Sequence, residues 1–197
     1  STELRDRLET LTRLFLYKII NPESGHFDLF FARDWKRLST IHSYGHDIEG
    51  AWLLHEAAEL IGDPSLTPEV ERASERLVEV TLNEGTDHDG SLFNESEDGV
   101  LDTDKHWWPQ AEAMVGYLDA YEITGNSAYL AECLRVWDFI KSYLIDREQG
   151  EWYWRVNKDG MPVETDDKAG FWKCPYHNSR ALMETLRRIE QITNEND

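Results

Sequence analysis

Two histidines, His46 and His177, stand close to the start of segments with helical periodicity. An imidazole has an ordinary pKa of about 6.5, so it can take up or release a proton near neutral pH. Glu49 follows His46 by three residues, which places both on one face of a helix, and a carboxylate at that distance can orient an imidazole. Arg180 follows His177 with the same spacing. These residue types are suited to proton transfer.

Aromatic and acidic residues accompany the histidines. Trp107 and Trp108 are adjacent, Glu112 follows Trp108 by four residues, and Trp172 precedes His177. The chain contains eight tryptophans and eight tyrosines, and aromatic rings can stack on the apolar faces of sugars. The same rings could instead fill a hydrophobic core. The sequence therefore favours a neutral ligand without excluding a structural role for these aromatic residues.

Each of these residues has an ordinary structural explanation as well. Glu49 could be a first-turn carboxylate favoured by the helix dipole, and Arg180 could form a surface ion pair. Cys174 is interpreted as a small buried residue rather than a nucleophile. His42 stays open between the two interpretations, because it lies close to His46. Structural roles are expected for the remaining histidines, namely His26, His55, His88 and His106.

Three copies of one unit position these residues. Each copy consists of an outer helix, a polar turn, a short aromatic strand, a long loop and an inner helix. Their inner helices end in AELIGDP, YEITGNS and EQITNEN, at intervals of about 63 to 69 residues. The expected outer helices are 4–19, 67–82 and 128–145, the aromatic segments are HFDLFF, SLFNES and EWYWRV, and the inner helices are 47–60, 109–123 and 178–192.

Helical hairpins in this order form either an open solenoid or a closed α/α toroid with its inner helices around a cavity. The inner helices begin with SYGHDIE, KHWWPQAE and WKCPYHNSRA, which would gather polar and aromatic groups at one mouth. This favours the toroid. We therefore expect an all-α fold with short strands in the long loops.

Length and composition limit the function classes. A chain of 197 residues that is 40% hydrophobic suits a single domain, 1–197. A formal charge of −19 disfavours nucleic acid and anionic membranes as partners, and no segment approaches the roughly 20 apolar residues of a membrane span. The spacing of the two cysteines suits a reducing cytoplasm rather than a zinc site. Without a Gly-rich dinucleotide loop or a metal triad, no cofactor or metal is expected.

The three inner-helix starts, taken together and in this order, carry a family resemblance. SYGHDIE with a downstream WWPQAE and WKCPYHNSRA resembles the C-terminal half of cellobiose 2-epimerases and their N-acylglucosamine 2-epimerase and mannose isomerase relatives. The resemblance extends over nearly the whole chain. It implies about half of an (α/α)6 barrel.

The resemblance implies roles for the residues above. His46 and His177 would be the acid and base on opposite faces of an aldose, and Glu49 would support His46. Trp108, Glu112 and Trp172 would contact the sugar, and Trp107 would help to build the wall of the barrel. Arg180 would support the residues that contact the sugar without touching the sugar itself. The implied reaction is inversion at C2 of an aldose or a β-1,4-linked disaccharide through an enediolate.

The resemblance leaves alternatives open. Aldose–ketose isomerases of the family share the histidine pair, and a non-catalytic sugar-binding α/α module would keep only the aromatic residues. A glycoside hydrolase would need two carboxylates from among Asp47, Glu49, Asp104 and Glu112. Because family members are roughly twice this length, we expect self-association or pairing with a missing N-terminal half, and little activity from this chain alone.

Overall fold

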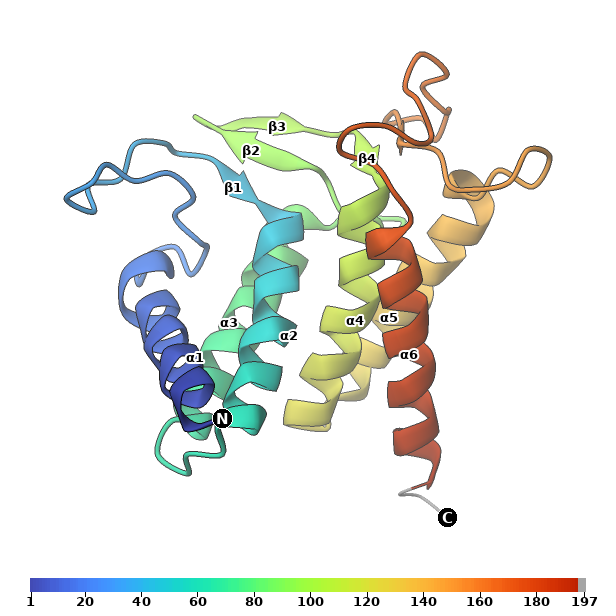
Figure 1. The fold of residues 1–197 in the computed structure, drawn as a ribbon. Coiled ribbons are helices and arrows are strands. Elements are labelled where there is room, and N and C mark those ends of the chain that lie inside the picture. The colour runs from blue at the N-terminus through green and yellow to red at the C-terminus, as the bar shows by residue number, and fades with distance from the viewer. Residues whose placement is uncertain (195–197) are drawn as a thin grey trace.

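The computed structural model describes residues 1–194 and is mainly helical (Figure 1). Outer and inner helices alternate along the chain, as the repeats predicted. The outer helices are α1 (Thr2–Leu14), α3 (Thr67–Gly85) and α5 (Ser127–Phe139), and the inner helices are α2 (Tyr44–Ile61), α4 (Trp107–Thr124) and α6 (Tyr176–Asn194). Single π-helical turns, Phe15–Ile19 and Ile140–Leu144, extend α1 and α5.

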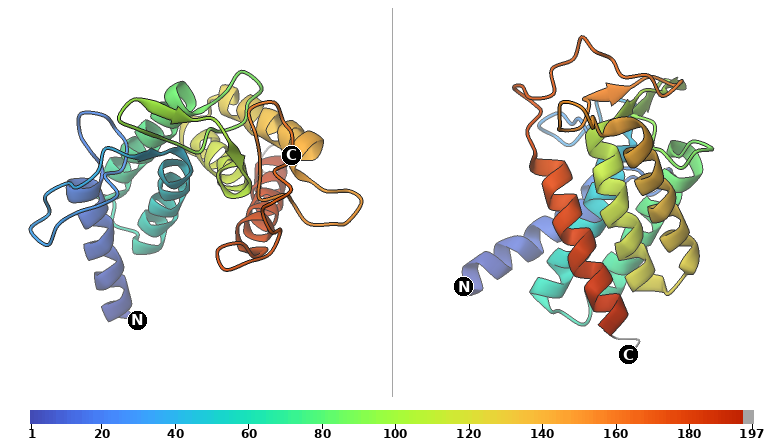
Figure 2. Two further views of the ribbon diagram at one scale, coloured as in Figure 1. Left: turned by 90° about the horizontal axis from the view of Figure 1, so that it is seen from above. Right: turned by 90° about the vertical axis from the view of Figure 1, so that its right-hand side faces the viewer.

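The helices form an open arc when seen from above (Figure 2, left). Inner helix α2 packs against α1, α3 and α4, and α4 packs against α2, α3, α5 and α6. The two ends of the arc, α1 and α6, have no further helix beside them within residues 1–194. This is the arrangement expected for part of a toroid.

The arc ends expose apolar side chains. On α6, Met183, Leu186 and Ile189 are exposed, and on α1, Leu4 and Leu11 are exposed. By contrast, α4 is buried along most of its length because helices cover it on several sides. Among the residues that the structure describes, both ends of the arc therefore carry uncovered apolar surface.

The three outer-helix turns share one backbone design. In each, a glycine adopts a positive φ, which costs a residue without Cβ little, and the chain then reverses into a short antiparallel bridge. The glycines are Gly25, Gly90 and Gly150, with φ of 84°, 91° and 78°. The bridges are Ile20 with Phe27, Thr86 with Leu92 and Ile145 with Trp152.

A polar side chain near the start of each inner helix reaches back to the turn of the same repeat. Asp47 Oδ1 accepts a hydrogen bond from the Phe27 amide at 2.8 Å. Gln110 Oε1 accepts one from the Leu92 amide at 2.7 Å. In the third repeat, the Asn178 side-chain amide donates instead to Glu151 at 2.8 Å. These bonds fix the N-terminal ends of the inner helices relative to the outer helices.

Short strands in the long loops lie above the N-terminal ends of the inner helices (Figure 1). Strands β1 (His42–Ser43), β2 (Glu95–Glu97) and β3 (Val100–Asp102) form one antiparallel sheet. Strands β4 (Lys105–His106) and β5 (Arg155–Val156) form a second sheet. Each sheet joins loops from two different repeats, so the mouth of the arc is assembled from distant segments.

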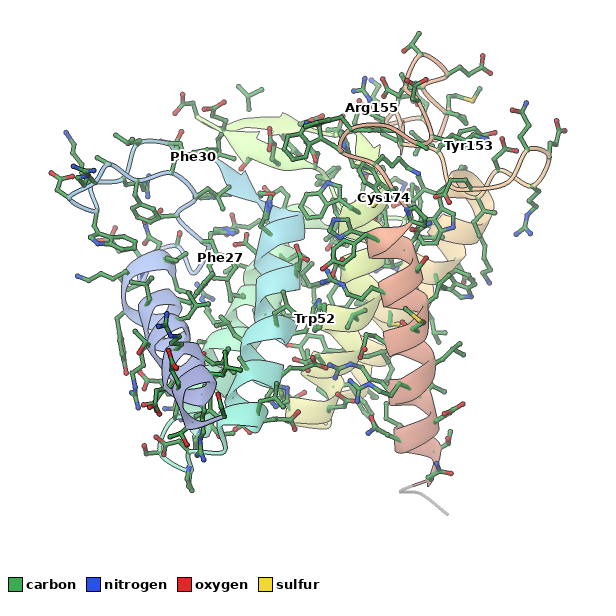
Figure 3. The ribbon with its side chains drawn as sticks, in the orientation of Figure 1. Phe27, Phe30, Trp52, Tyr153, Arg155 and Cys174 are labelled. Atoms are coloured by element: carbon green, nitrogen blue, oxygen red, sulfur yellow. The ribbon has the colours of Figure 1, made fainter. Side chains whose placement is uncertain are left out.

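Close contact between α2 and α4 depends on small residues. A Cβ added to Gly45 would lie 2.4 Å from the Trp108 ring, and one added to Gly116 would lie 2.4 Å from Ile48. Phe27 packs between α1 and α2, and Trp52 extends from α2 toward α4 (Figure 3).

Within residues 1–194, no helix combines the length and the apolar character that crossing a bilayer requires.

Candidate active site

A cavity of about 250 Å³ lies at the N-terminal ends of the inner helices. His46 from α2 and His177 from α6 both line it, as the sequence predicted. The other lining residues are Glu49, His106, Trp107, Trp108, Trp154 and Trp172. The arc therefore brings the two imidazoles, which are 131 residues apart in sequence, to one hollow.

Glu112 holds His177 from behind. His177 Nδ1 lies 2.6 Å from Glu112 Oε1, and the Glu112 side chain is completely buried. The indole of Trp52 donates to the second carboxylate oxygen at 3.1 Å. Because an ionised carboxylate only accepts, Nδ1 of His177 carries the hydrogen, and Nε2 is left free to exchange a proton.

Arg180 forms ion pairs with two carboxylates. Its guanidinium donates to Glu49 at 2.5 Å and to Glu112 at 2.7 Å. It also lies over the Trp52 ring, 4.9 Å from the ring centroid. Burial alone would lower the pKa of Arg180, but the hydrogen bonds to Glu112 and Glu49 outweigh burial and raise its pKa. Arg180 thus bonds to both carboxylates and links α2, α4 and α6.

His46 has a different support from the one expected. Its Nδ1 lies 2.7 Å from the hydroxyl of Ser43, which directly precedes α2. Its ring meets Trp108 edge to face, with 4.8 Å between centroids. The structure gives Glu49 to Arg180 instead. Glu49 was predicted to support His46, but its carboxylate bonds to the Arg180 guanidinium of α6. A charged guanidinium is the stronger partner for a carboxylate.

Aromatic rings form one side of the cavity. Trp107 is buried and packs against Trp154, with 4.9 Å between centroids, while the Lys173 ammonium lies over the Trp107 ring. Trp108 lies between the two catalytic candidates, 5.6 Å from the His177 ring. Trp172 is 78% exposed. Trp107 is thus a wall residue, whereas Trp108 and Trp172 remain available to a ligand.

The expected contact of Glu112 with a sugar also differs from the structure. Glu112 is buried behind His177 and does not line the cavity. Glu112 and Trp108 are four residues apart and share one face of α4. Whether a side chain on that face reaches the cavity depends on how α6 packs against α4.

Sequence reasoning missed three contributors to this site. Ser43, which contacts His46, was passed over as part of a loop, although its position before a helix is a common one for a side-chain hydrogen bond. Trp154 lay in the aromatic segment of the third repeat without an assigned role. His106 received an ordinary structural interpretation, yet it lines the cavity, and burial lowers its pKa.

Three further histidines, His26, His55 and His88, have carboxylate partners. His55 Nδ1 lies 2.8 Å from buried Asp119, and exposed His88 lies 2.7 Å from Asp87. His26 Nδ1 lies 2.7 Å from buried Asp47. These contacts fit the structural interpretation given to them.

The sequence profile of the N-acylglucosamine 2-epimerase (GlcNAc 2-epimerase) family matches residues 1–181. The chain belongs to this family. It is 43% identical over 185 residues to cellobiose 2-epimerase of Bacteroides fragilis, which covers 93% of the chain and 47% of that protein. It is 30% identical over 145 residues to N-acylglucosamine 2-epimerase of Mus musculus, which covers 70% of the chain and 34% of that protein.

Solved structures of relatives show the same architecture. Cellobiose 2-epimerase from Bacillus thermoamylovorans superposes with a TM-score of 0.90 and 37% identity, covering 95% of this chain and 48% of that one. A D-mannose isomerase superposes with a TM-score of 0.84 at 22% identity, covering 94% of this chain and 50% of that one, which shows the fold alone. The chain thus corresponds to about half of an (α/α)6 barrel and spans about half the length of these relatives.

Proposed function

We propose that this chain supplies the acid–base pair and one wall of a carbohydrate 2-epimerase. The observation that carries the proposal is that His46 and His177 line one cavity from different inner helices. Similarity to relatives named cellobiose 2-epimerase supports an aldose, or a β-1,4-linked disaccharide of the cellobiose type, as the substrate.

The reaction requires removal of a proton next to a carbonyl. The sugar ring opens to the aldehyde, one histidine takes the C2 proton, and an enediolate forms. The other histidine then returns a proton to C2 on the opposite face. Glu112 keeps Nε2 of His177 free for this exchange, and Ser43 restrains the His46 ring.

Electrostatic support for the enediolate must come from donors near its oxygens, since general acid–base catalysis contributes only about 10² to 10⁴ in rate. Arg180 already donates to Glu49 and Glu112. We propose that this chain is a single domain, the C-terminal half of the barrel, and that the facing half supplies further donors.

The exposed apolar residues at the arc ends support such a facing half. Met183 and Leu186 are each 63% exposed on α6, and Leu4 is 68% exposed on α1. We propose that these edges are covered by a second half-barrel, either an N-terminal half or another copy of the chain. Sedimentation of the chain as a monomer at high concentration, without apolar-dye binding, would contradict self-association.

The test of the proposed function is incorporation of deuterium at C2 in deuterated water, followed by NMR on cellobiose, with the complete barrel present. We expect exchange in the parent protein and its loss, by at least about 10²-fold, in His46→Ala and in His177→Ala. His88→Ala, which removes an exposed histidine remote from the cavity, is the matched control. Exchange at the parent rate in both active-site variants would exclude the acid–base assignment.

The same experiment separates the alternatives. Return of the proton to C1 rather than C2 would produce a ketose, and this product would assign an aldose–ketose isomerase. Binding of cellobiose without any exchange would assign a sugar-binding module. We place the protein in the cytoplasm on the basis of its two free cysteines, and fractionation of the source cells would test this. Cys133 is buried, whereas Cys174 is exposed and not buried as the sequence suggested.

A further inference from the structure

A second cluster of imidazole and carboxylate groups lies outside the cavity. His26 comes from the turn after α1, His42 from β1 and Glu84 from the end of α3. One ligand atom from each of the three lies within 4.8 Å of the others, and none of the three lines the cavity of the candidate active site. The sequence showed no metal triad and predicted no metal site; these three residues come from three separate segments.

The His26 ring is held in one orientation. It is 1% exposed, and its Nδ1 lies 2.7 Å from Asp47, whose carboxylate is also buried and accepts from the Phe27 amide. Nδ1 therefore carries the hydrogen, and Nε2 is the nitrogen that remains available to a ligand. A carboxylate behind an imidazole is the usual arrangement around histidine metal ligands, because it fixes the ring and raises its basicity.

Nε2 of His26 faces a second carboxylate. It lies 3.3 Å from Glu84 Oε2. With Nδ1 protonated, a neutral ring presents a lone pair to an oxygen that also only accepts, so a positive centre is needed between them. A second proton on the ring would serve, and so would a metal ion. The separation is close to the roughly 3.4 Å expected between two ligands of tetrahedral zinc at 2.0–2.2 Å.

His42 supplies a third donor. Its ring stacks on that of His26, with centroids 4.1 Å apart and planes inclined by 20°. Imidazole lone pairs lie in the ring plane, so the partly buried His42 ring must turn out of this stack when both rings bind one ion. Two imidazoles and one carboxylate form a donor set that suits zinc and its neighbours in the first transition row. Glu84 is half exposed, so its side chain has room to move toward an ion.

The other candidate cluster differs in one respect. Glu49, Glu112 and His177 also approach within 4.8 Å of one another, but the Arg180 guanidinium already donates to both carboxylates. In that cluster, Arg180 already supplies the positive charge that a metal ion would otherwise bring. In the cluster of His26, His42 and Glu84, by contrast, no Lys or Arg nitrogen among residues 1–194 forms an ion pair with Glu84.

We propose that His26, His42 and Glu84 bind one divalent metal ion of the zinc class, with Asp47 orienting His26. The ion would join three segments, namely β1, α3 and the turn that follows α1. Because β1 contains Ser43 and leads directly into α2, which carries His46, the site anchors the segment that positions one of the two cavity histidines.

The test is titration of the metal-free chain with Zn²⁺, followed by calorimetry, and with Co²⁺, followed by the visible absorption of tetrahedral cobalt. We expect one ion per chain and a higher melting temperature with metal. His42→Gln and Glu84→Gln should each weaken binding at least about tenfold. Both side chains are less buried than His26, and melting curves of the metal-free variants will verify that they fold.

Two controls make the outcome decisive. His88→Gln removes an exposed histidine with its own carboxylate partner and should leave affinity unchanged. His177→Gln disrupts the other cluster and should also leave it unchanged. The proposal is overturned if no saturable binding occurs below millimolar Zn²⁺, if His42→Gln and Glu84→Gln bind like the parent, or if His177→Gln alone abolishes binding.

Discussion

Two charged clusters join the same three inner helices at different depths. The upper cluster consists of Arg180, Glu49, Glu112 and His177. The lower cluster repeats its helix positions seven residues later, at Glu56, Asp119 and Arg187, with Arg188 beside them. Seven residues are nearly two helical turns, so both clusters occupy the same faces of α2, α4 and α6.

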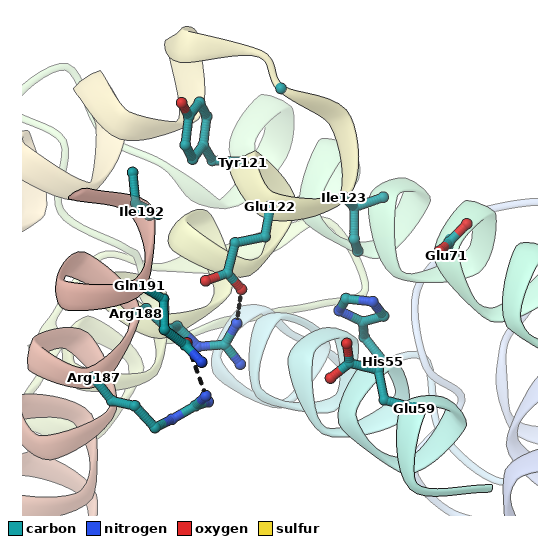
Figure 4. Close-up of a pocket in the computed structure, with 11 residues that line it drawn as sticks. His55, Glu59, Glu71, Tyr121, Glu122, Ile123, Arg187, Arg188, Gln191 and Ile192 are labelled. Atoms are coloured by element: carbon teal, nitrogen blue, oxygen red, sulfur yellow. Dashed lines mark hydrogen bonds and ion pairs between the residues drawn. The ribbon is translucent and has the colours of Figure 1, made fainter. Parts of the chain in front are cut away.

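The lower cluster is the more heavily ionic of the two. Arg188 is 3% exposed and bonds to Glu122 (Figure 4). It also bonds to Asp119 and Glu56, and Asp119 in turn contacts His55. Burial raises the pKa of Glu122 and outweighs the opposing effect of Arg188. The surrounding pocket is lined mainly by charged and amide side chains.

Position along the helices accounts for the difference. The upper cluster lies near the helix N-termini, beneath loops that contribute Trp107, Trp108 and Trp172, and it leaves one nitrogen of His177 free. The lower cluster lies near the C-terminal ends, where Asp119 engages both His55 and Arg188. Similar ion-pair geometry therefore supports a cavity histidine at one end and helix association at the other.

The largest expected effect on activity is that of Glu112→Gln in the upper cluster. Without the carboxylate, His177 loses the acceptor that fixes its tautomer, and deuterium exchange at C2 should fall by about 10² to 10⁴. Asp119→Asn makes the same chemical change one layer lower and should leave the exchange rate of the folded protein within a fewfold of the parent. Equal losses in the two variants would abolish the functional distinction between the clusters.

The largest expected effect on stability is that of Arg188→Leu in the lower cluster. This change leaves Asp119 and Glu122 without their buried cation and should lower the free energy of unfolding by about 3–5 kcal/mol. Arg187→Leu is the matched control, because Arg187 is half exposed, and it should cost less than about 1 kcal/mol. Denaturant unfolding measures both, and similar values would show that burial does not govern the lower cluster.

A smaller effect on activity is expected at the aromatic side of the cavity, which is present only at the N-terminal ends of the inner helices. Trp172→Ala should raise KM roughly tenfold, equivalent to about 1.4 kcal/mol, with little change in melting temperature because the ring is exposed. Phe171→Ala removes the neighbouring exposed ring, which does not line the cavity. Steady-state kinetics with the complete barrel should show no KM change in that control.

The smallest effect concerns the pH dependence of the lower cluster. Burial would lower the pKa of His55, but the hydrogen bond to Asp119 outweighs it and raises the pKa above 6.5. The pair therefore stabilises the fold fully below pH 6.5, and this contribution is lost as the pH rises through the raised pKa. Melting temperatures between about pH 6 and 9 should decline less in His55→Gln than in the parent. His88→Gln should follow the parent curve.

The alternation of outer and inner helices could be predicted from sequence because it is local. Apolar spacing marks the faces, and the polar or glycine-containing stops mark the ends, so the predicted inner helix 109–123 lies within the observed α4, Trp107–Thr124. The same local reasoning identified SYGHDIE and WKCPYHNSRA as helix starts. It therefore brought His46 and His177 to one mouth, since inner helices of successive hairpins run side by side.

Partner choice was decided only in the tertiary structure. Glu49 lies three residues from His46, yet its carboxylate bonds to Arg180, 131 positions away. Glu112 is buried because α6 covers it, and His26, His42 and Glu84 meet because a turn, a strand and a helix end converge. The sequence determines which groups each helix face carries. Which of them pair, and which are shielded from water, depends on contacts between distant segments that no local pattern encodes.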